Sequence, residues 1–229
     1  MESTVQLLEV RNDSWDSIYD NPTITSGAWK DYADGFILDR FTHNLTLDTK
    51  IIEIGCGDGR NLLHLLKLGY KVTGIDISAT ALERTIEHAN SIGLAHNLTL
   101  VQADAQACNL ASESFDVAFA TQVLDHVNNP ASVVREVHRL LKNGGRFYVQ
   151  FSSTNDTAIS LGIPLGNKQR DYHGFLFSFF DKSDLDVLFA DWQVIDISRV
   201  VINDPPHPGW REEPHEHDYW VVTASKTES

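Results

Sequence analysis

The stretch Ile51-Ile52-Glu53-Ile54-Gly55-Cys56-Gly57-Asp58-Gly59-Arg60 is the part of this chain that best predicts its fold. A short apolar run ends in three glycines on alternate positions, and a leucine-rich segment with helical spacing follows. This order predicts a strand, a tight turn and the start of a helix. Glycines let the backbone approach a ligand where a Cβ would clash, and a helix N-terminus offers unpaired N–H groups to polar or anionic groups. The stretch therefore predicts a binding site for a nucleotide-like cofactor.

The spacing of the glycines and two nearby acids narrow the kind of cofactor. A dinucleotide fingerprint reads G-x-G-x-x-G, but Arg60 stands at its third glycine position and Gly59 comes one residue early. Glu53 precedes the loop. Asp76 ends the next apolar run, about 20 residues on, where a strand-end carboxylate accepts hydrogen bonds from ribose hydroxyls. The plain alternatives are a tight turn without a ligand and, for Glu53, a buried carboxylate that only orients the loop.

Four further segments match a known family in order and spacing. They are 101–105, 115–127, 140–149 and the aromatic segment Trp15-Asp16-Ser17-Ile18-Tyr19. With the glycine stretch they resemble the class I S-adenosylmethionine-dependent methyltransferases, closely over residues 50–149, and within them the small-molecule type with a methyltransferase domain 11 or 25. The resemblance implies an α/β fold with a Rossmann-like seven-stranded sheet, helices on both faces and the last strand antiparallel.

The resemblance also implies which residues bind S-adenosyl-L-methionine. The backbone at the first two glycines would approach the methionine end, with Cys56 contacting it through the main chain. Asp76 would hold the ribose, and Asp104 the adenine amine unless it only caps a turn. Tyr19 would close over the cofactor, or would instead anchor its helix. The whole implied set is Tyr19, Glu53, Gly55, Cys56, Gly57, Asp76, Ile77, Asp104, Ala105, Thr121 and Gln122.

Catalytic residues are harder to predict than cofactor residues. Methyl transfer from a sulfonium is an in-line displacement, and it needs a general base only if the acceptor is protonated. His126 follows the expected fourth strand and is the candidate base. The alternative is a histidine that packs or hydrogen-bonds within a loop.

The segment 204–218 is unusually rich in histidine. His207, His215 and His217 have side chains of the type that binds metal ions. Two histidines two positions apart point to one face only if the segment is extended. A solvated acidic loop or a lid over the substrate is the alternative that we favour, and we expect no metal.

Composition limits the partners. The chain has 229 residues, of which 42% are hydrophobic, and a formal net charge of −14. This charge disfavours nucleic acids and anionic membranes, and it fits a small neutral or cationic acceptor. Two cysteines are too few for a disulfide scaffold, and no signal-peptide pattern precedes the core. We expect a cytoplasmic monomer or homodimer.

We expect one domain over residues 1–229. Residues 1–48 form an N-terminal helical cap, 49–151 the cofactor-binding core, 152–182 a substrate-side insertion, and 183–229 the last helix with a C-terminal strand pair. Ser78 and Asn129 have the side chains of helix N-caps. The cap, the insertion and the histidine-rich segment are the candidates for the acceptor pocket.

The expected function is methyl transfer from S-adenosyl-L-methionine to a small molecule. A protein or RNA methyltransferase of the same fold is the first alternative, and the acidic charge counts against it. A nicotinamide-dependent oxidoreductase is disfavoured by Arg60 and by the lack of a Tyr-x-x-x-Lys pair. A non-catalytic cofactor-binding protein ranks last because the glycine loop and both strand-end acids are intact.

Overall fold

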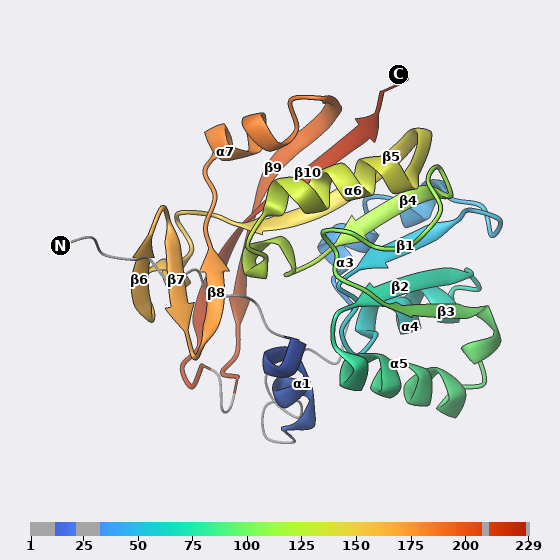
Figure 1. Ribbon diagram of the computed structural model, residues 1–229, viewed down its shortest axis with the longest axis horizontal. Coiled ribbons are helices and arrows are strands. Elements are labelled where there is room, and N and C mark those ends of the chain that lie inside the picture. The colour runs from blue at the N-terminus through green and yellow to red at the C-terminus, as the bar shows by residue number, and fades with distance from the viewer. Residues whose placement is uncertain (1–11, 22–32, 208–210, 228–229) are drawn as a thin grey trace.

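A seven-stranded sheet forms the centre of the computed structural model, which describes residues 12–21, 33–207 and 211–227 (Figure 1). Its strands are β1 (Ile51–Ile54), β2 (Val72–Asp76), β3 (Leu98–Gln102), β4 (Phe115–Ala120), β5 (Leu141–Ser152), β9 (Trp192–Asp204) and β10 (His215–Lys226). The helices are α1 (Asn12–Asp20), α3 (Gly35–Leu38), α4 (Arg60–Lys67), α5 (Ala79–Ser91), α6 (Pro130–Leu140) and α7 (Lys182–Leu188), with short 3-10 turns η1 (Thr42–Asn44), η2 (Ala95–Asn97), η3 (Leu124–His126) and η4 (Thr157–Ser160).

The strand order is β3-β2-β1-β4-β5-β10-β9. The first five strands run parallel, and β10 lies antiparallel between β5 and β9. The expected seven-stranded sheet with an antiparallel last strand is therefore confirmed. The ladder between β9 and β10 continues to the pair Asp204–His215, beyond the apolar part of either strand. Polar residues there carry no alternating apolar signal, so the sequence does not show that the hairpin extends so far.

Side chains alternate between the two faces of the sheet, and helices cover both. Ile51 packs with α4 and α5 residues such as Leu62 on one face, whereas Ile52 packs with Val133 of α6 on the other. Leu185 of α7 packs on the same face as Ile52 and Val133. In Figure 1, α4 and α5 lie on the side opposite α6. The helices on both faces are thus confirmed.

Two helices, α5 and α6, begin with side-chain caps at the edge of the sheet where ligands bind in this kind of fold. The hydroxyl of Ser78 accepts a hydrogen bond from the N–H of Ala81 and caps α5. Asn129 caps α6 by accepting from the N–H of Ser132, with Pro130 as the first helical residue. Both caps agree with the sequence prediction.

The segment 152–182 forms its own small sheet, with the order β6 (Ile163–Gly166), β7 (Gln169–Tyr172) and β8 (Phe175–Ser178). A bridge from Ser153 to Phe180 joins the two ends of the segment directly after β5, and β8 packs on η3. Figure 1 shows this sheet beside the loop end of the β9–β10 hairpin. Among the described residues, no helix has the length and apolar character that a membrane span requires.

Candidate functional site

A pocket opens beyond the carboxyl ends of β1 and β4, and it brings together residues from distant parts of the chain. Of the residues predicted from the sequence, it is lined by Tyr19, Glu53, Gly55, Cys56, Gly57, Thr121, Gln122 and His126. Binding at this edge is what open α/β sheets favour, because the loops after parallel strands meet there.

Both predicted positions of the loop, Gly55 and Gly57, require glycine. Gly55 and Gly57 have φ of 66° and 54°, a region that other residues rarely adopt. A Cβ on Gly57 would lie 2.4 Å from the hydroxyl oxygen of Tyr19, and one on Gly55 would lie 2.3 Å from a methyl of Val123. The hydroxyl of Thr85 donates to the carbonyl of Gly57 over 2.8 Å and holds the loop against α5.

Glu53 lies at the bottom of the pocket, and only 1% of its surface is exposed. The side-chain amide of Asn61 donates to its Oε1 over 2.7 Å and also reaches the hydroxyl of Thr121 over 3.1 Å. The other oxygen, Oε2, is buried without a hydrogen-bond partner. Burial raises the pKa of Glu53 well above its ordinary value. The pocket therefore holds a carboxyl group suited to a cationic ligand group.

Arg60 and Gln122 form a polar wall beside Glu53. The guanidinium of Arg60 lies 2.5 Å from a carboxylate oxygen of Asp34, and it donates to Oε1 of Gln122 over 3.2 Å. The amide nitrogen of Gln122 donates to the hydroxyl of Tyr219 over 3.2 Å. Gln122 has a φ of 56°, so its backbone is held in the left-handed region at the end of β4.

Sequence reasoning missed Asn61 and Tyr219 as pocket residues, and it used Arg60 only to argue against a dinucleotide. Arg60 and Asn61 occupy the first two positions of α4, directly after the glycine loop. That position is a signal that could have pointed to them. Tyr219 comes from β10, nearly 100 residues from Gln122 in the sequence, and no local pattern shows the contact.

Four predicted residues lie along the same sheet edge but do not line this pocket: Asp76, Ile77, Asp104 and Ala105. The carboxylate of Asp76 accepts from the N–H groups of Gly57 and Ser78 over 2.8 and 2.9 Å. Burial raises its pKa. Asp104 follows β3, is exposed and accepts from the N–H of Gln106. Their contacts with a cofactor stay predictions.

Helix α1 is held over the pocket by one carboxylate. Asp16 accepts from the hydroxyl of Ser78 over 2.6 Å and from the N–H of Thr80 over 3.2 Å. This places Trp15 and the buried Tyr19 in the pocket wall. Burial raises the pKa of Tyr19 well above its ordinary value, so its phenol is neutral at pH 7.

His126 and its neighbour Asp125 both line the pocket. Nδ1 of His126 lies 2.8 Å from the carbonyl oxygen of Leu176, so this nitrogen carries a proton and donates. Its ring packs edge-on against Phe177, with centroids 4.4 Å apart. Burial lowers its pKa to about 4, which keeps the ring neutral at pH 7.

Asp125 is a titratable group that the sequence analysis did not single out. Its carboxyl oxygens accept from the N–H and the hydroxyl of Ser152 over 3.0 and 2.7 Å. Burial raises its pKa to about 7 despite these hydrogen bonds. A carboxyl group with this pKa exchanges a proton near neutral pH, as a general base must.

The three segments expected at the acceptor side all line the pocket. Helix α1 contributes Trp15, the insertion contributes Tyr172 and Phe177, and the β9–β10 hairpin contributes His207 and His215. The pocket thus has a polar floor near the glycine loop and aromatic rings on the opposite side.

Sequence comparisons support this description for the core. Residues 52–149 match the family model described as a methyltransferase domain. A ubiquinone biosynthesis O-methyltransferase of Stutzerimonas stutzeri (strain A1501) is 35% identical over 114 residues, which is 50% of this chain and 49% of that protein. The sterol 4-C-methyltransferase strm-1 of Caenorhabditis elegans is 34% identical over 113 residues, 49% of this chain and 34% of that protein. The matched segments therefore span half or less of these relatives.

Solved structures share the fold over nearly the whole chain. A structure from work on the conversion of a disulfide bond into a thioacetal group during echinomycin biosynthesis has a TM-score of 0.75 at 19% identity, covering 95% of this chain and 93% of that one. The 1,6-didemethyltoxoflavin-N1-methyltransferase of Burkholderia thailandensis, with S-adenosylhomocysteine bound, has a TM-score of 0.61 at 21% identity, covering 94% and 83%. A [4+2]-cyclase, SpnF, has a TM-score of 0.65 at 19% identity, covering 85% and 80%.

The strand order, the glycine loop and these matches agree with one another. Residues 52–149 match the methyltransferase-domain family model, and the chain shares the Rossmann-like fold of the class I S-adenosylmethionine-dependent methyltransferases.

Proposed function

We propose that this chain transfers a methyl group from S-adenosyl-L-methionine to a small-molecule acceptor. The observation that carries the proposal is the glycine loop between β1 and α4, with a buried carboxyl group below it and Asp76 beside it. The similar proteins are named as methyltransferases of ubiquinone biosynthesis, of sterols and of 1,6-didemethyltoxoflavin, which supports the choice of a small acceptor.

The residues present suit the cofactor. Its methionine part has an ammonium group beside a sulfonium, and Oε2 of Glu53 is a buried acceptor without a partner at the bottom of the pocket. Pairing with a cation favours the ionised carboxylate, which burial alone disfavours. Gly55 and Gly57 have no Cβ, and this lets Val123 and Tyr19 pack directly against the loop that would hold the methionine end. S-adenosyl-L-methionine supplies an electrophilic methyl group when bound.

The protein's own part is to hold the two reactants and to manage a proton. Tyr19 and the glycine loop would hold the methionine end, while Thr121 and Gln122 form the floor below the sulfonium. Asp76 with Ile77 would hold the ribose, and Asp104 with Ala105 the adenine. These four lie at the ends of β2 and β3, next to β1 in the sheet, which supports a cofactor laid along this edge.

Asp125 is the group that we assign as general base for an acceptor that must lose a proton. Its pKa of about 7 matches that task better than the pKa of about 4 of His126. His126 stays the base predicted from the sequence. Its packing against Trp15 and Phe177 supports a second role as an aromatic wall for an acceptor with an apolar part.

The remaining expectations follow from the charge and composition. An acidic monomer or homodimer in the cytoplasm, without nucleic-acid or membrane partners, agrees with a net charge of −14. The similarity to the [4+2]-cyclase concerns the fold alone. Because one fold can host different reactions, the reaction of this chain has to be measured.

Calorimetric titration of the chain with S-adenosylhomocysteine, run beside NAD, tests the proposal. We expect one site for S-adenosylhomocysteine, none for NAD, and weaker binding in Asp76→Ala. Preference for NAD, or no binding of either ligand, would overturn the assignment. Methyl transfer from radiolabelled cofactor to a panel of aromatic and aliphatic acceptors then tests the catalytic part. A protein that binds the cofactor but methylates nothing in the panel contradicts the assigned small-molecule activity.

A further inference from the structure

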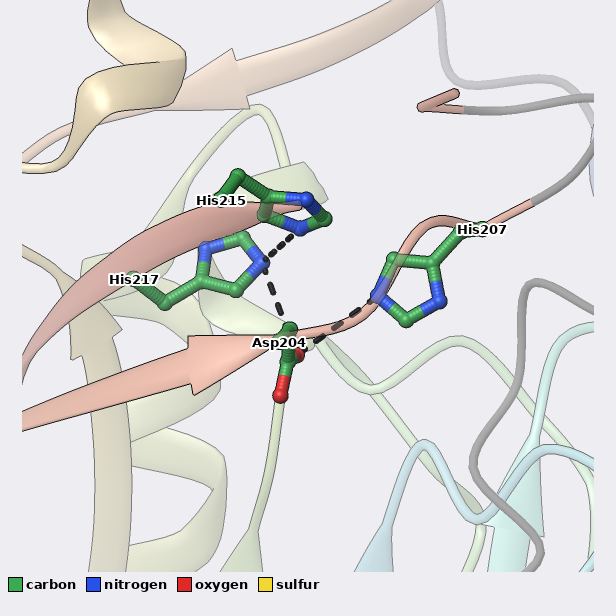
Figure 2. A group of neighbouring side chains, drawn as sticks. All are labelled: Asp204, His207, His215 and His217. Atoms are coloured by element: carbon green, nitrogen blue, oxygen red, sulfur yellow. Dashed lines mark hydrogen bonds and ion pairs between the residues drawn. The ribbon is translucent and has the colours of Figure 1, made fainter. Parts of the chain in front are cut away.

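Four potential metal ligands converge at the loop end of the β9–β10 hairpin, where β9 ends and β10 begins (Figure 2). Asp204 ends β9, His207 follows it, and His215 and His217 begin β10. One ligand atom from each lies within 4.8 Å of every other. Asp204, His207 and His215 are buried, and the side chain of His217 is 16% exposed. The segment at His215–His217 is extended, which is the condition under which alternate histidines share a face.

The hydrogen bonds of His215 and His217 define which nitrogens hold protons. Nδ1 of His215 lies 2.8 Å from the carbonyl oxygen of Glu213, and Nδ1 of His217 lies 3.0 Å from Oδ2 of Asp156. Both partners are acceptors, so both Nδ1 atoms carry the proton and donate. In the neutral rings each Nε2 therefore presents a lone pair.

These two lone pairs face each other, because the Nε2 atoms of His215 and His217 are 3.0 Å apart. Two lone pairs at that distance repel unless a cation stands between them or beside both. An extra proton would do this by making one ring an imidazolium. A metal ion bound by both Nε2 atoms would do the same, and the carboxylate of Asp204 lies close enough to be a further ligand.

The surroundings have the features of a metal site. Ligating histidines usually donate their second N–H to a carboxylate or a backbone carbonyl, which orients the ring and raises its basicity. Both partners are present here. Asp156 is itself held, since its carboxylate accepts from the N–H groups of Ala158 and Asp218 over 2.7 and 2.9 Å.

The spacing around Asp204 also fits. Its Oδ2 lies 3.5 Å from Nε2 of His207 and 3.8 Å from Nε2 of His217. These distances are long for hydrogen bonds. Bonds of about 2.0–2.1 Å around a tetrahedral ion place neighbouring ligand atoms about 3.4 Å apart. To reach that arrangement the longer separations would shorten and the two Nε2 atoms at 3.0 Å would move slightly apart.

We propose that Asp204, His207, His215 and His217 bind one divalent transition-metal ion of the Zn²⁺ type, through one carboxylate oxygen and three Nε2 atoms. Three imidazoles with one carboxylate suit Zn²⁺ and its neighbours rather than Mg²⁺ or Ca²⁺, which prefer oxygen ligands. The ion would close the β9–β10 hairpin and make it a firm wall of the pocket. This proposal replaces our sequence-based expectation of no metal in this segment, and it does not depend on the proposed methyl transfer.

Metal binding by the full chain, free of any histidine tag, tests the site directly. The protein is stripped with a chelator, dialysed and titrated with Zn²⁺ by calorimetry and with Co²⁺ by visible absorption. We expect one ion per chain, a Kd tighter than about 1 µM and the strong visible bands of tetrahedral Co²⁺. Bound Zn²⁺ should also raise Tm, because it binds only the folded hairpin.

Variants locate the ion. His215→Gln and His217→Gln should each weaken Zn²⁺ binding by at least about 100-fold, and Asp156→Asn by about 10- to 100-fold. His96→Gln is the matched control, because this exposed histidine lies in η2, before the strand at the opposite edge of the sheet, and the variant should bind as the parent does.

Two results would overturn the site. One is the absence of Zn²⁺ and Co²⁺ binding by the unmodified chain, which would leave a metal-free histidine cluster sharing a proton. The other is unchanged binding in a folded His215→Gln/His217→Gln double variant. Because the first result needs no variant, failure of a variant to fold does not remove the test.

Discussion

The side-chain amide of Asn61 donates to Oε1 of Glu53 over 2.7 Å, while Oε2 of the same carboxyl group is buried without a hydrogen-bond partner. The first contact orients the carboxyl group, and the second oxygen is left for a ligand. Leaving such an atom unmatched costs about 1–3 kcal/mol, which a bound cation would recover. Asn61 thus prepares Glu53 for binding.

Glu53→Gln should weaken binding of S-adenosyl-L-methionine by about 10- to 100-fold, the value of one hydrogen bond to a charged group. Burial raises the pKa of Glu53, so the unliganded site holds a proton that a cationic ligand displaces. Affinity should therefore rise with pH in the parent and lose this dependence in the variant. Calorimetry at several pH values measures both effects. A variant that keeps both the affinity and its slope would show that Glu53 only supports the loop.

Gly57→Ala should abolish binding of S-adenosylhomocysteine. The new Cβ would meet the hydroxyl of Tyr19, and a positive φ costs a non-glycine residue about 1–2 kcal/mol. Adding Tyr19→Phe removes the clashing oxygen but leaves the backbone cost, so the double variant should recover only part of the lost stability. Thermal unfolding measures the change in stability, and calorimetry measures the change in binding. The exposed Gly93, which also has a positive φ but no atom near its Cβ, is the control for backbone strain alone.

Asp125 should titrate near pH 7, and His126 should stay neutral until about pH 4. Because folding raises the pKa of Asp125, its protonated form stabilises the native state below its unfolded value, and this stability is lost as pH rises through about 7. NMR titration of the carboxyl carbon and of the imidazole protons gives both values.

Two variants test the cause of the raised pKa of Asp125 and its role as a base. Ser152→Ala removes the hydrogen bond from the hydroxyl to the ionised carboxylate, so it should raise the pKa of Asp125 further. The remaining backbone N–H of residue 152 limits the effect. Once an acceptor is known, Asp125→Asn should lower kcat by about 100- to 10,000-fold if the acceptor must lose a proton. A pH–rate inflection near 4 instead of 7 would favour His126 as the base.

Ser78→Ala should cost about 1–2 kcal/mol of stability and also lower cofactor affinity. It removes the N-cap of α5 and the hydrogen bond to Asp16 that holds α1, which carries Tyr19, over the pocket. Denaturant unfolding and ligand titration measure the two losses. Thr80→Ala is the matched control, because Thr80 contacts Asp16 through its backbone N–H, which alanine keeps.

Local sequence signals were enough to predict the parallel core and the glycine-loop side of the pocket. The apolar run, glycine loop and helix start of residues 51–60 act through local backbone preferences, and the N-caps at Ser78 and Asn129 are equally local. The order of strands then placed Thr121 and Gln122 beside that loop, as the resemblance implies.

The chemistry of the other pocket walls, around Asp125 and the β9–β10 loop, depends on contacts between distant parts of the chain. The pKa of Asp125 depends on burial and on Ser152, a contact across 27 residues. The ligand cluster depends on β9 and β10 pairing as far as Asp204 and His215, beyond any apolar pattern. Burial and long-range pairing are properties of the packed chain, so local sequence could name these residues but could not show which of their atoms meet.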